Sequence, residues 1–239
     1  MPCSYCASSG YIRSGDNEYV VSVEGTNADE VQRVASALLE TANIKLNRKE
    51  TENINILIIF ANPKDIEPLR LSTEDKAIRE SIKFSQYRDN IQVNVLHAAT
   101  IHDVRRALLE SSYKIIHFSG HGAGDGLVFE NESGKPHIVM PNALADFLAA
   151  YSPPIECVIL NACYTKSQGQ LLASSIPYTI ATESPISNSG AIEFTRGFYD
   201  AIGAGKTIEF AYQEGCRTMR LTGHQTSDIP LLFSSFTKE

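Results

Sequence analysis

Two apolar stretches, each followed by a chemically reactive side chain, decide the fold expected for this chain. The first is "IIHFSGHGAG" (residues 115–124), and about forty residues later comes "VILNACYT" (residues 158–165). Continuous apolar runs of this length are typical of strands that are buried on both faces of a parallel sheet. In such sheets the reactive groups gather just beyond the carboxyl ends of the strands. We therefore expect His121 and Cys163 at that edge of one sheet.

The rest of the chain predicts a mostly parallel sheet that helices cover on both faces, an α/β fold. Apolar runs alternate with amphipathic helical patterns from residue 54 onward. Strands are expected at residues 54–60, 91–98, 113–119, 156–162 and 177–182, with two short strands within 126–140. Helices are expected at residues 74–84, 103–109, 141–151, 190–205 and 206–219.

The N-terminal part differs in composition and predicts a separate small unit. Within residues 1–52, the run "YVVSV" (residues 19–23) predicts a strand and residues 27–42 have the spacing of one amphipathic helix. A strand and a helix cannot bury a core alone, so this appendage, an adaptor of unknown role, is expected to pack on the main domain, on a partner or on a copy of itself. The remaining residues, 53–239, form the main domain.

Bulk properties exclude several classes of function. The 239 residues are 43% hydrophobic, and their net charge of −7 with no basic cluster argues against direct nucleic-acid binding. No apolar run approaches the roughly 18 residues of a membrane span, and the N-terminus does not resemble a signal peptide. We therefore expect a cytoplasmic protein that does not bind membranes.

The cysteines are sparse and odd in number, which predicts free thiols rather than a disulfide framework. They are Cys3, Cys6, Cys157, Cys163 and Cys216. The first two form half of a zinc site with no second half in the sequence, so neither a metal nor a cofactor is expected. Cys157 and Cys216 are expected to be core residues, and His117, inside a strand, is expected to be a core or interface residue.

Cys163 and His121 are the pair that could carry chemistry. A thiol is a good nucleophile only as the thiolate, and a neighbouring imidazole can take its proton and later protonate a leaving amine. Gly120 and Gly122 flank the histidine and let a substrate chain approach closely. The backbone N–H groups of Gly122 and Cys163 could form an oxyanion hole, worth roughly 2.7–4 kcal/mol per donor.

These motifs resemble the CHAT domain, a bacterial branch of the caspase-like cysteine peptidases. The segments "ILIIFANPKDIEPLRLSTEDKAIRESI", "HFSGHG", "GLVFENESGK", "LNACYT" and "GAIEFTRGFYDAIGAGKTIEFAYQEGC" occur in the family's order and cover residues 54–236. The resemblance implies a caspase-like αβα sandwich, with His121 as general base and acid and Cys163 as nucleophile. The N-terminal unit carries no such resemblance.

The resemblance also points to residues that could bind substrate. In relatives, the residue two before the nucleophile helps to line the pocket for the side chain that precedes the cut, and here it is the neutral Asn161. Glu183, in the loop after the following strand, could supply a charge to that pocket or could be a solvated loop residue. Asp125, near the dyad, could contact substrate.

The leading hypothesis is a cysteine endopeptidase that cleaves a specific protein target in bacterial antiphage defence or programmed cell death. A partner protein or a ligand-bound complex would activate it. The alternative is a non-catalytic binding or scaffold module that recruits partners through its N-terminal segment. A small-ligand or nucleotide sensor is the weakest hypothesis, since no glycine-rich phosphate loop follows the first strand of the main domain.

Overall fold

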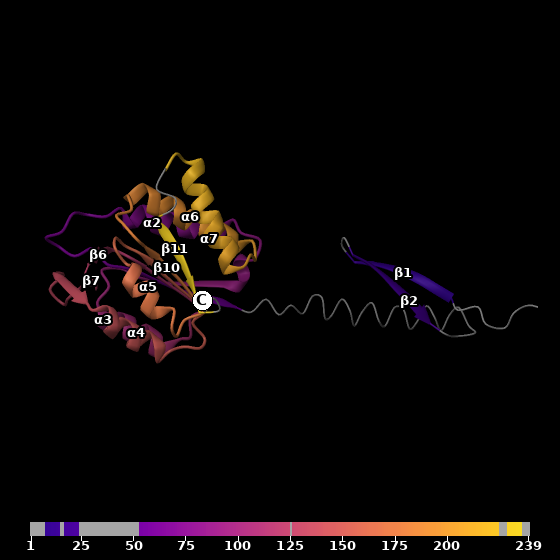
Figure 1. Cartoon of the computed structure of the whole chain (residues 1–239), viewed down its shortest axis with the longest axis horizontal. Coiled ribbons are helices and arrows are strands. Elements are labelled where there is room, and N and C mark those ends of the chain that lie inside the picture. The colour runs from indigo at the N-terminus through magenta and orange to yellow at the C-terminus, as the bar shows by residue number, and fades with distance from the viewer. Residues whose placement is uncertain (1–7, 15–16, 24–52, 125, 225–228, 236–239) are drawn as a thin grey trace, which may run out of the picture. The chain divides into compact units, whose positions relative to one another are not determined.

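The computed structural model describes residues 8–14, 17–23, 53–124, 126–224 and 229–235 of the chain. The chain divides into two compact units, residues 1–52 and residues 53–239. Figure 1 shows the two units and labels their helices and strands.

The N-terminal unit contains an antiparallel pair of strands. β1 (Ser8–Ser14) pairs with β2 (Asn17–Val23), with Ser8 opposite Val23 and Ser14 opposite Asn17. The expected strand at residues 19–23 is therefore present, and β1 is an additional strand that the sequence did not predict. The helix expected at residues 27–42 lies outside the described residues.

The second unit is built on a six-stranded sheet with the order β11-β10-β9-β5-β3-β4. Its strands are β3 (Ile54–Phe60), β4 (Ile91–Leu96), β5 (Ile115–Ser119), β9 (Cys157–Asn161), β10 (Tyr178–Thr182) and β11 (Pro230–Ser234). Every neighbouring pair is parallel except β10 and β11 at one edge. The prediction of a mostly parallel α/β sheet is confirmed.

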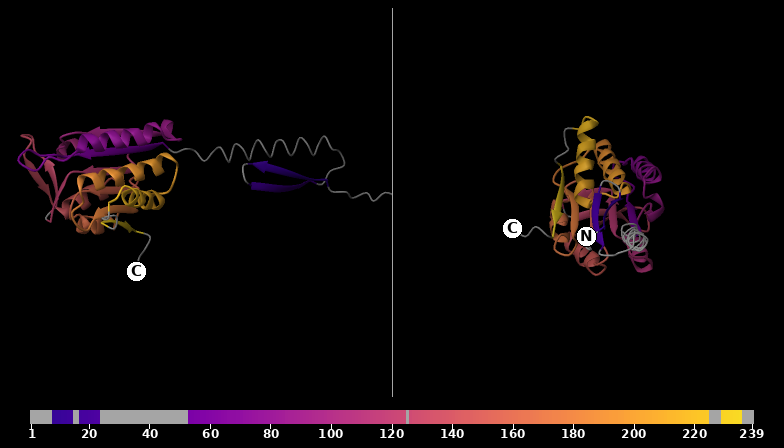
Figure 2. Two further views of the ribbon diagram at one scale, coloured as in Figure 1. Left: turned by 90° about the horizontal axis from the view of Figure 1, so that it is seen from above. Right: turned by 90° about the vertical axis from the view of Figure 1, so that its right-hand side faces the viewer.

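Helices cover both faces of this sheet and make an αβα sandwich, which Figures 1 and 2 show from three directions. On one face lie α2 (Leu71–Lys83), α6 (Asn188–Gly203) and α7 (Ile208–Leu221). On the other lie α3 (Ile101–Glu110), α4 (Pro141–Ala149) and α5 (Lys166–Leu172). A single 3₁₀ turn, η1 (Arg88–Asn90), precedes β4.

Alternating apolar side chains hold the three layers together. In β3, Leu57 and Ile59 pack into the core beneath α3, α4 and α5, whereas Ile56, Ile58 and Phe60 pack into the core beneath α2, α6 and α7. All five are buried, and each such side chain contributes roughly 1.5–3 kcal/mol of transfer free energy. Because both faces are covered, the strands read as unbroken apolar runs in the sequence.

A small antiparallel sheet extends from the end of β5. It consists of β6 (His121–Ala123), β7 (Gly126–Glu130) and β8 (Pro136–Val139), with His121 opposite Val128. The turn between β7 and β8 is stabilised by Asn131, whose side-chain oxygen accepts hydrogen bonds from the backbone N–H groups of Ser133 and Lys135. The two short strands expected within residues 126–140 are confirmed, and β6 fixes the backbone of His121.

Two strands and one α-helix of this unit were not predicted, each for a physical reason. α5 has seven residues with a glycine in the middle, and β11 begins with a proline, so neither has a strong local signal. β6 has only three residues. α2 begins three residues earlier than expected because its N-cap, Arg70, makes no side-chain capping hydrogen bond that would mark the start.

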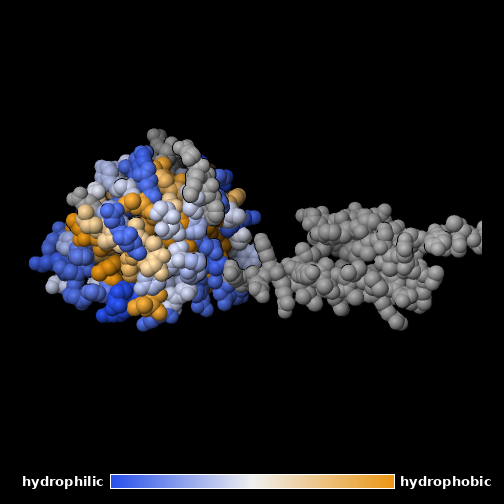
Figure 3. All heavy atoms as spheres, turned by 60° about the horizontal axis from the view of Figure 1, so that its bottom comes forward, coloured by the Kyte–Doolittle hydropathy of each residue, from blue (hydrophilic) through white to orange (hydrophobic). Residues whose placement is uncertain are grey.

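The surface is mixed in polarity. Figure 3 shows hydrophilic residues interspersed with smaller apolar areas on one face of the second unit. Among the described residues, the large apolar side chains that are most exposed are Phe84, Leu109 and Leu221. No helix in the described ranges is both long and apolar enough to span a bilayer.

Candidate active site

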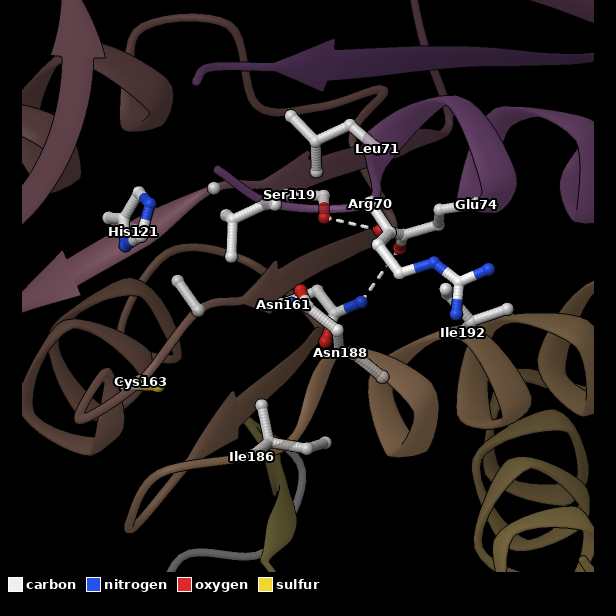
Figure 4. Close-up of a pocket in the computed structure, with 14 residues that line it drawn as sticks. Arg70, Leu71, Glu74, Ser119, His121, Asn161, Cys163, Ile186, Asn188 and Ile192 are labelled. Carbon is white, nitrogen blue, oxygen red and sulfur yellow. Dashed lines mark hydrogen bonds between the residues drawn. The ribbon is translucent and has the colours of Figure 1, made fainter. Parts of the chain in front are cut away.

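The sheet brings the ends of β5 and β9 together and places His121 and Cys163 on one pocket. The two strands are parallel neighbours, and their last residues, Ser119 and Asn161, are register partners. Each reactive residue lies two positions beyond its strand, so both leave the sheet at the same edge. Both line the same pocket, and Figure 4 shows them at one end of it, with Glu74 at the other.

The imidazole of His121 is oriented by a backbone carbonyl. Its Nε2 lies 2.9 Å from the carbonyl oxygen of Glu67, in the loop before α2. A carbonyl oxygen can only accept, so Nε2 carries the proton and donates it, which leaves Nδ1 as the unprotonated nitrogen of the neutral ring. His121 is half-buried. The neutral ring thus keeps Nδ1 free to accept a proton.

The backbone turns sharply just after Cys163. Tyr164 has a φ of 58°, in the left-handed region that side chains other than glycine rarely adopt. The buried Thr165 stabilises this turn, since its hydroxyl lies within hydrogen-bond distance of the carbonyl oxygens of Leu160 (3.3 Å) and Ala162 (3.2 Å). The thiol of Cys163 is half-buried at this turn, at the pocket wall. Such local strain is common where a reactive side chain must be presented.

Gly122 connects the histidine and cysteine segments through direct backbone contact. A Cβ atom at this position would lie 1.9 Å from the carbonyl oxygen of Cys163, so no other residue fits without a shift of the backbone. Within the described part of the chain, no group accepts a hydrogen bond from the Cys163 N–H. The two predicted oxyanion-hole residues therefore lie side by side, and their role stays a prediction. No hydrogen bond joins the His121 and Cys163 side chains among the described residues.

Asn161 borders the pocket as expected, but its side-chain amide is already engaged. Its Nδ2 donates to Glu74 Oε1 at 2.7 Å and lies 3.3 Å from the hydroxyl of Thr195. Only 6% of the residue is exposed. The amide nitrogen is therefore held in place by the protein and is not free to bind a substrate side chain.

Glu74, which is only 2% exposed, is a buried carboxylate at the centre of this polar cluster. Its Oε2 accepts a hydrogen bond of 2.5 Å from Ser119, and its Oε1 accepts one of 2.9 Å from Thr195. Burial alone would raise the pKa of Glu74, but hydrogen bonds from His117, Ser119 and Asn161, together with the charge of His117, bring it below its usual value. Glu74 is therefore ionised at neutral pH.

His117 is fully buried below this cluster, in agreement with the prediction of a core histidine. Its Nδ1 lies 3.0 Å from the hydroxyl of Tyr199, and its Nε2 lies 3.3 Å from Glu74 Oε1. Burial, with Cys157 and Glu74 nearby, raises the pKa of Tyr199 well above its usual value. The phenol thus keeps its proton, and the His117 ring lies between this hydroxyl and the Glu74 carboxylate.

Of the other two predicted substrate-binding residues, the structure describes only Glu183, which does not lie on this pocket. Glu183 is 55% exposed, is paired with Lys166 Nζ, and does not line the pocket. Asp125 lies outside the described residues. Within the described ranges, no group of three or more His, Cys, Asp or Glu side chains could hold a metal ion.

Most of the pocket wall is apolar, and a few polar groups lie at its base and rim. The apolar wall is formed by Leu69, Leu71, Ala162, Ile186, Ala191 and Ile192. Arg70 and Asn188 also line the pocket, and Arg70 is exposed.

The sequence reasoning missed Glu74, Ser119 and the carbonyl of Glu67. One signal for Glu74 was present: it lies at helical spacing from Leu71, Ile78 and Ser81, all on the buried face of α2. A charged residue on such a face is rarely left without partners. The Glu67 carbonyl carries no sequence signal, because any residue supplies a backbone oxygen.

The fold is that of the caspase-like cysteine proteases. A secreted C11 cysteine protease from Bacteroides thetaiotaomicron superposes with a TM-score of 0.57, at 12% identity, over 77% of this chain and 67% of its own. The Arg-specific cysteine proteinase gingipain R superposes with a TM-score of 0.53, at 11% identity, over 77% of this chain and 47% of its own. At these identities the likeness establishes the fold alone.

The chain belongs to the CHAT domain family, whose model matches residues 11–237. The match starts inside the N-terminal unit, for which the sequence analysis found no resemblance. A Roc-COR-CHAT protease from Runella zeae is 22% identical over 171 residues, covering 68% of this chain. This chain spans only 17% of that protein's length.

Proposed function

We propose that this protein is a cysteine endopeptidase in which Cys163 attacks a peptide bond and His121 transfers the protons. The observation that carries the proposal is the joint position of the two residues. Both lie on one pocket just beyond paired strands, with the imidazole held by Glu67 and the Cys163 N–H unpartnered among the described residues. The family and its fold supply the same chemistry.

The proposed reaction has two steps. His121 Nδ1 takes the proton from Cys163 Sγ, and the thiolate attacks the carbonyl carbon, while the Cys163 N–H stabilises the negative oxygen. The imidazolium then gives its proton to the leaving amine, which departs and leaves a thioester. In the second step a water molecule, deprotonated by Nδ1, attacks the thioester and releases the acid and the free thiol.

We further propose that a protein partner or a ligand-bound complex activates the enzyme. The absence of a hydrogen bond between His121 and Cys163 supports this, although such bonds are often long in enzymes without substrate. The loops that border a peptidase groove often need to be ordered before the reaction can proceed. The N-terminal unit, residues 1–52, is the segment through which recruitment would occur.

The proposed setting is the bacterial cytoplasm, in antiphage defence or programmed cell death. The resemblance to CHAT domains motivates this setting, and the named relative from Runella zeae pairs a CHAT protease with Roc and COR units. Among the described residues, Cys157 and Cys163 carry free thiols, which supports a reducing compartment as the setting. The target would be a specific protein.

Mass spectrometry of new protein N-termini in host cells would test the proposal. Cells that express the wild-type chain, with and without phage infection, should gain one or a few cleaved proteins. Cells that express Cys163→Ala at equal abundance should gain none. Stable binding of a partner without cleavage in any condition would contradict the proposal and favour the scaffold alternative.

A further inference from the structure

The segments that carry the two reactive residues share one buried hydrogen-bond acceptor. Ser119 lies two residues before His121, and Asn161 lies two residues before Cys163. Ser119 donates to Glu74 Oε2 and Asn161 donates to Glu74 Oε1, at 2.5 Å and 2.7 Å. Each oxygen of a single carboxylate therefore holds one strand end, and Figure 4 draws both bonds as dashed lines.

Further contacts make this carboxylate a junction of four elements. Glu74 comes from α2, Ser119 and His117 from β5, Asn161 from β9, and Thr195 from α6. Thr195 donates to Oε1 at 2.9 Å, and His117 Nε2 lies 3.3 Å from the same atom. Each of these residues is 6% exposed or less, and hydrogen bonds in such buried surroundings are strong and costly to lose.

A second contact links α2 to His121, through the loop that precedes the helix. The loop that leads into α2 carries Glu67, whose carbonyl accepts the hydrogen bond from His121 Nε2. A shift of α2 would therefore move the imidazole through Glu67 and the strand ends through Glu74. The backbone bond between Gly120 N–H and the Asn161 carbonyl, at 3.4 Å, is long and does not fix the spacing as firmly.

We propose that Glu74 is a positioning residue that sets the separation and orientation of His121 and Cys163 by holding Ser119 and Asn161 at once. It does not touch the reacting atoms. This inference rests on the proposed function, since positioning matters only if the two residues react together. It adds a residue of α2 to the groups that position His121 and Cys163.

Two substitutions separate hydrogen bonding from charge. In Glu74→Gln the remaining oxygen can still accept from Asn161 and Thr195, while the new amide can donate to the Ser119 hydroxyl, which both donates and accepts. Glu74→Leu has a similar volume and accepts nothing. Ile82→Ala, which truncates a buried side chain on the same helix, is the matched control for loss of stability.

The test follows alkylation of Cys163 by iodoacetamide at pH 7 with mass spectrometry, in the purified full chain and in host lysate. Iodoacetamide needs no substrate recognition. Glu74→Leu should slow labelling of Cys163 roughly tenfold, because a misplaced imidazole no longer takes the proton. Glu74→Gln should stay within about twofold of wild type. The Ile82→Ala control should also stay near wild type.

A double-mutant cycle excludes a merely structural effect. If Glu74 acts through His121, Glu74→Leu should add nothing in a His121→Ala background. The buried thiols of Cys157 and Cys216 report on the fold, and they should stay unlabelled in every variant. Additive effects, or labelling of those two thiols in Glu74→Leu, would overturn the proposal. A Glu74→Gln variant as slow as Glu74→Leu would also overturn it.

Crystal structures of the same variants distinguish this inference from the proposed function. If wild-type Cys163 shows no dependence on His121 in either setting, the proposed reaction fails, but the geometry can still be compared. Glu74→Leu should release the Ser119 and Asn161 side chains and change the distance from His121 to Cys163 Sγ. An unchanged distance in Glu74→Leu would overturn the positioning role whatever the enzyme does.

Discussion

A histidine and a cysteine occur both within β5 and β9 (the inner residues) and just beyond these strands (the outer residues), with different surroundings. Within β5 and β9, His117 and Cys157 are 0% exposed and belong to the core. Just beyond the strands, His121 and Cys163 are half-buried and line a pocket. Position relative to the strand end, more than residue type, therefore decides whether an imidazole or a thiol can meet a substrate.

The electrostatic surroundings of the inner residues, His117 and Cys157, also differ from those of the outer residues, His121 and Cys163. Burial, with a smaller contribution from Glu156, raises the pKa of Cys157 far above that of a free thiol, so Cys157 stays protonated and unreactive. His117 lies between the Glu74 carboxylate and the Tyr199 phenol. The inner residues are thus structural, and the outer residues are the candidates for chemistry.

The largest difference between the two cysteines should appear in cleavage of the target protein. Cys163→Ala removes the nucleophile and should lower the cleavage rate by about 10³-fold or more. Cys157→Ala removes only a buried sulfur and should leave the rate within about twofold. Both variants would be assayed on the target found in cells. A cleavage rate of Cys163→Ala near that of the wild type would contradict the role of Cys163 as nucleophile.

The two histidines should separate activity from stability. His121→Ala should lower the cleavage rate by about 10²–10⁴-fold, and change the free energy of unfolding by less than about 0.5 kcal/mol. His117→Ala leaves the buried Tyr199 hydroxyl without its partner and should lower the free energy of unfolding by about 1–3 kcal/mol. Urea unfolding and the cleavage assay would measure both. The reverse pattern would contradict the assignment.

The buried thiol of Cys157 should also affect how the free energy of unfolding depends on pH. The unfolded chain releases the Cys157 proton near pH 9.0, whereas the folded chain holds it to higher pH. The folded state then binds more protons, so the free energy of unfolding should fall above pH 9, by about 1.4 kcal/mol per pH unit. Cys157→Ala removes this dependence. Equal slopes for wild type and Cys157→Ala between pH 9 and 10 would refute it.

The smallest effect is expected for Glu183, on the loop after β10. Its ion pair with Lys166 is exposed, and such pairs contribute about 0–1 kcal/mol. Glu183→Gln should therefore change the cleavage rate by less than about twofold. Initial-rate assays would compare Glu183→Gln with Glu193→Gln, a control on α6. A loss of tenfold or more in Glu183→Gln would indicate that Glu183 binds substrate.

The positions of His121 and Cys163 could be predicted because each follows a continuous apolar run, a local pattern. The pairing of Ser119 and Asn161 through Glu74 could not, since it joins residues 45 and 87 positions apart in the sequence. Asn161 was expected at the pocket from the resemblance. The hydrogen bonds that engage its amide could not be predicted, because their acceptors lie on α2 and α6. Whether Gly122 and Cys163 form the oxyanion hole stays a prediction.

The most direct measurement is the rate at which iodoacetamide labels each cysteine at pH 7, in the wild-type chain and in His121→Ala. It would be made in the purified chain and in host lysate. The account predicts that Cys163 is labelled about tenfold faster than an ordinary exposed thiol, that this advantage disappears without His121, and that Cys157 stays unlabelled. Labelling of Cys163 no faster than Cys3 or Cys6 in both settings, whether or not His121 is present, would contradict it.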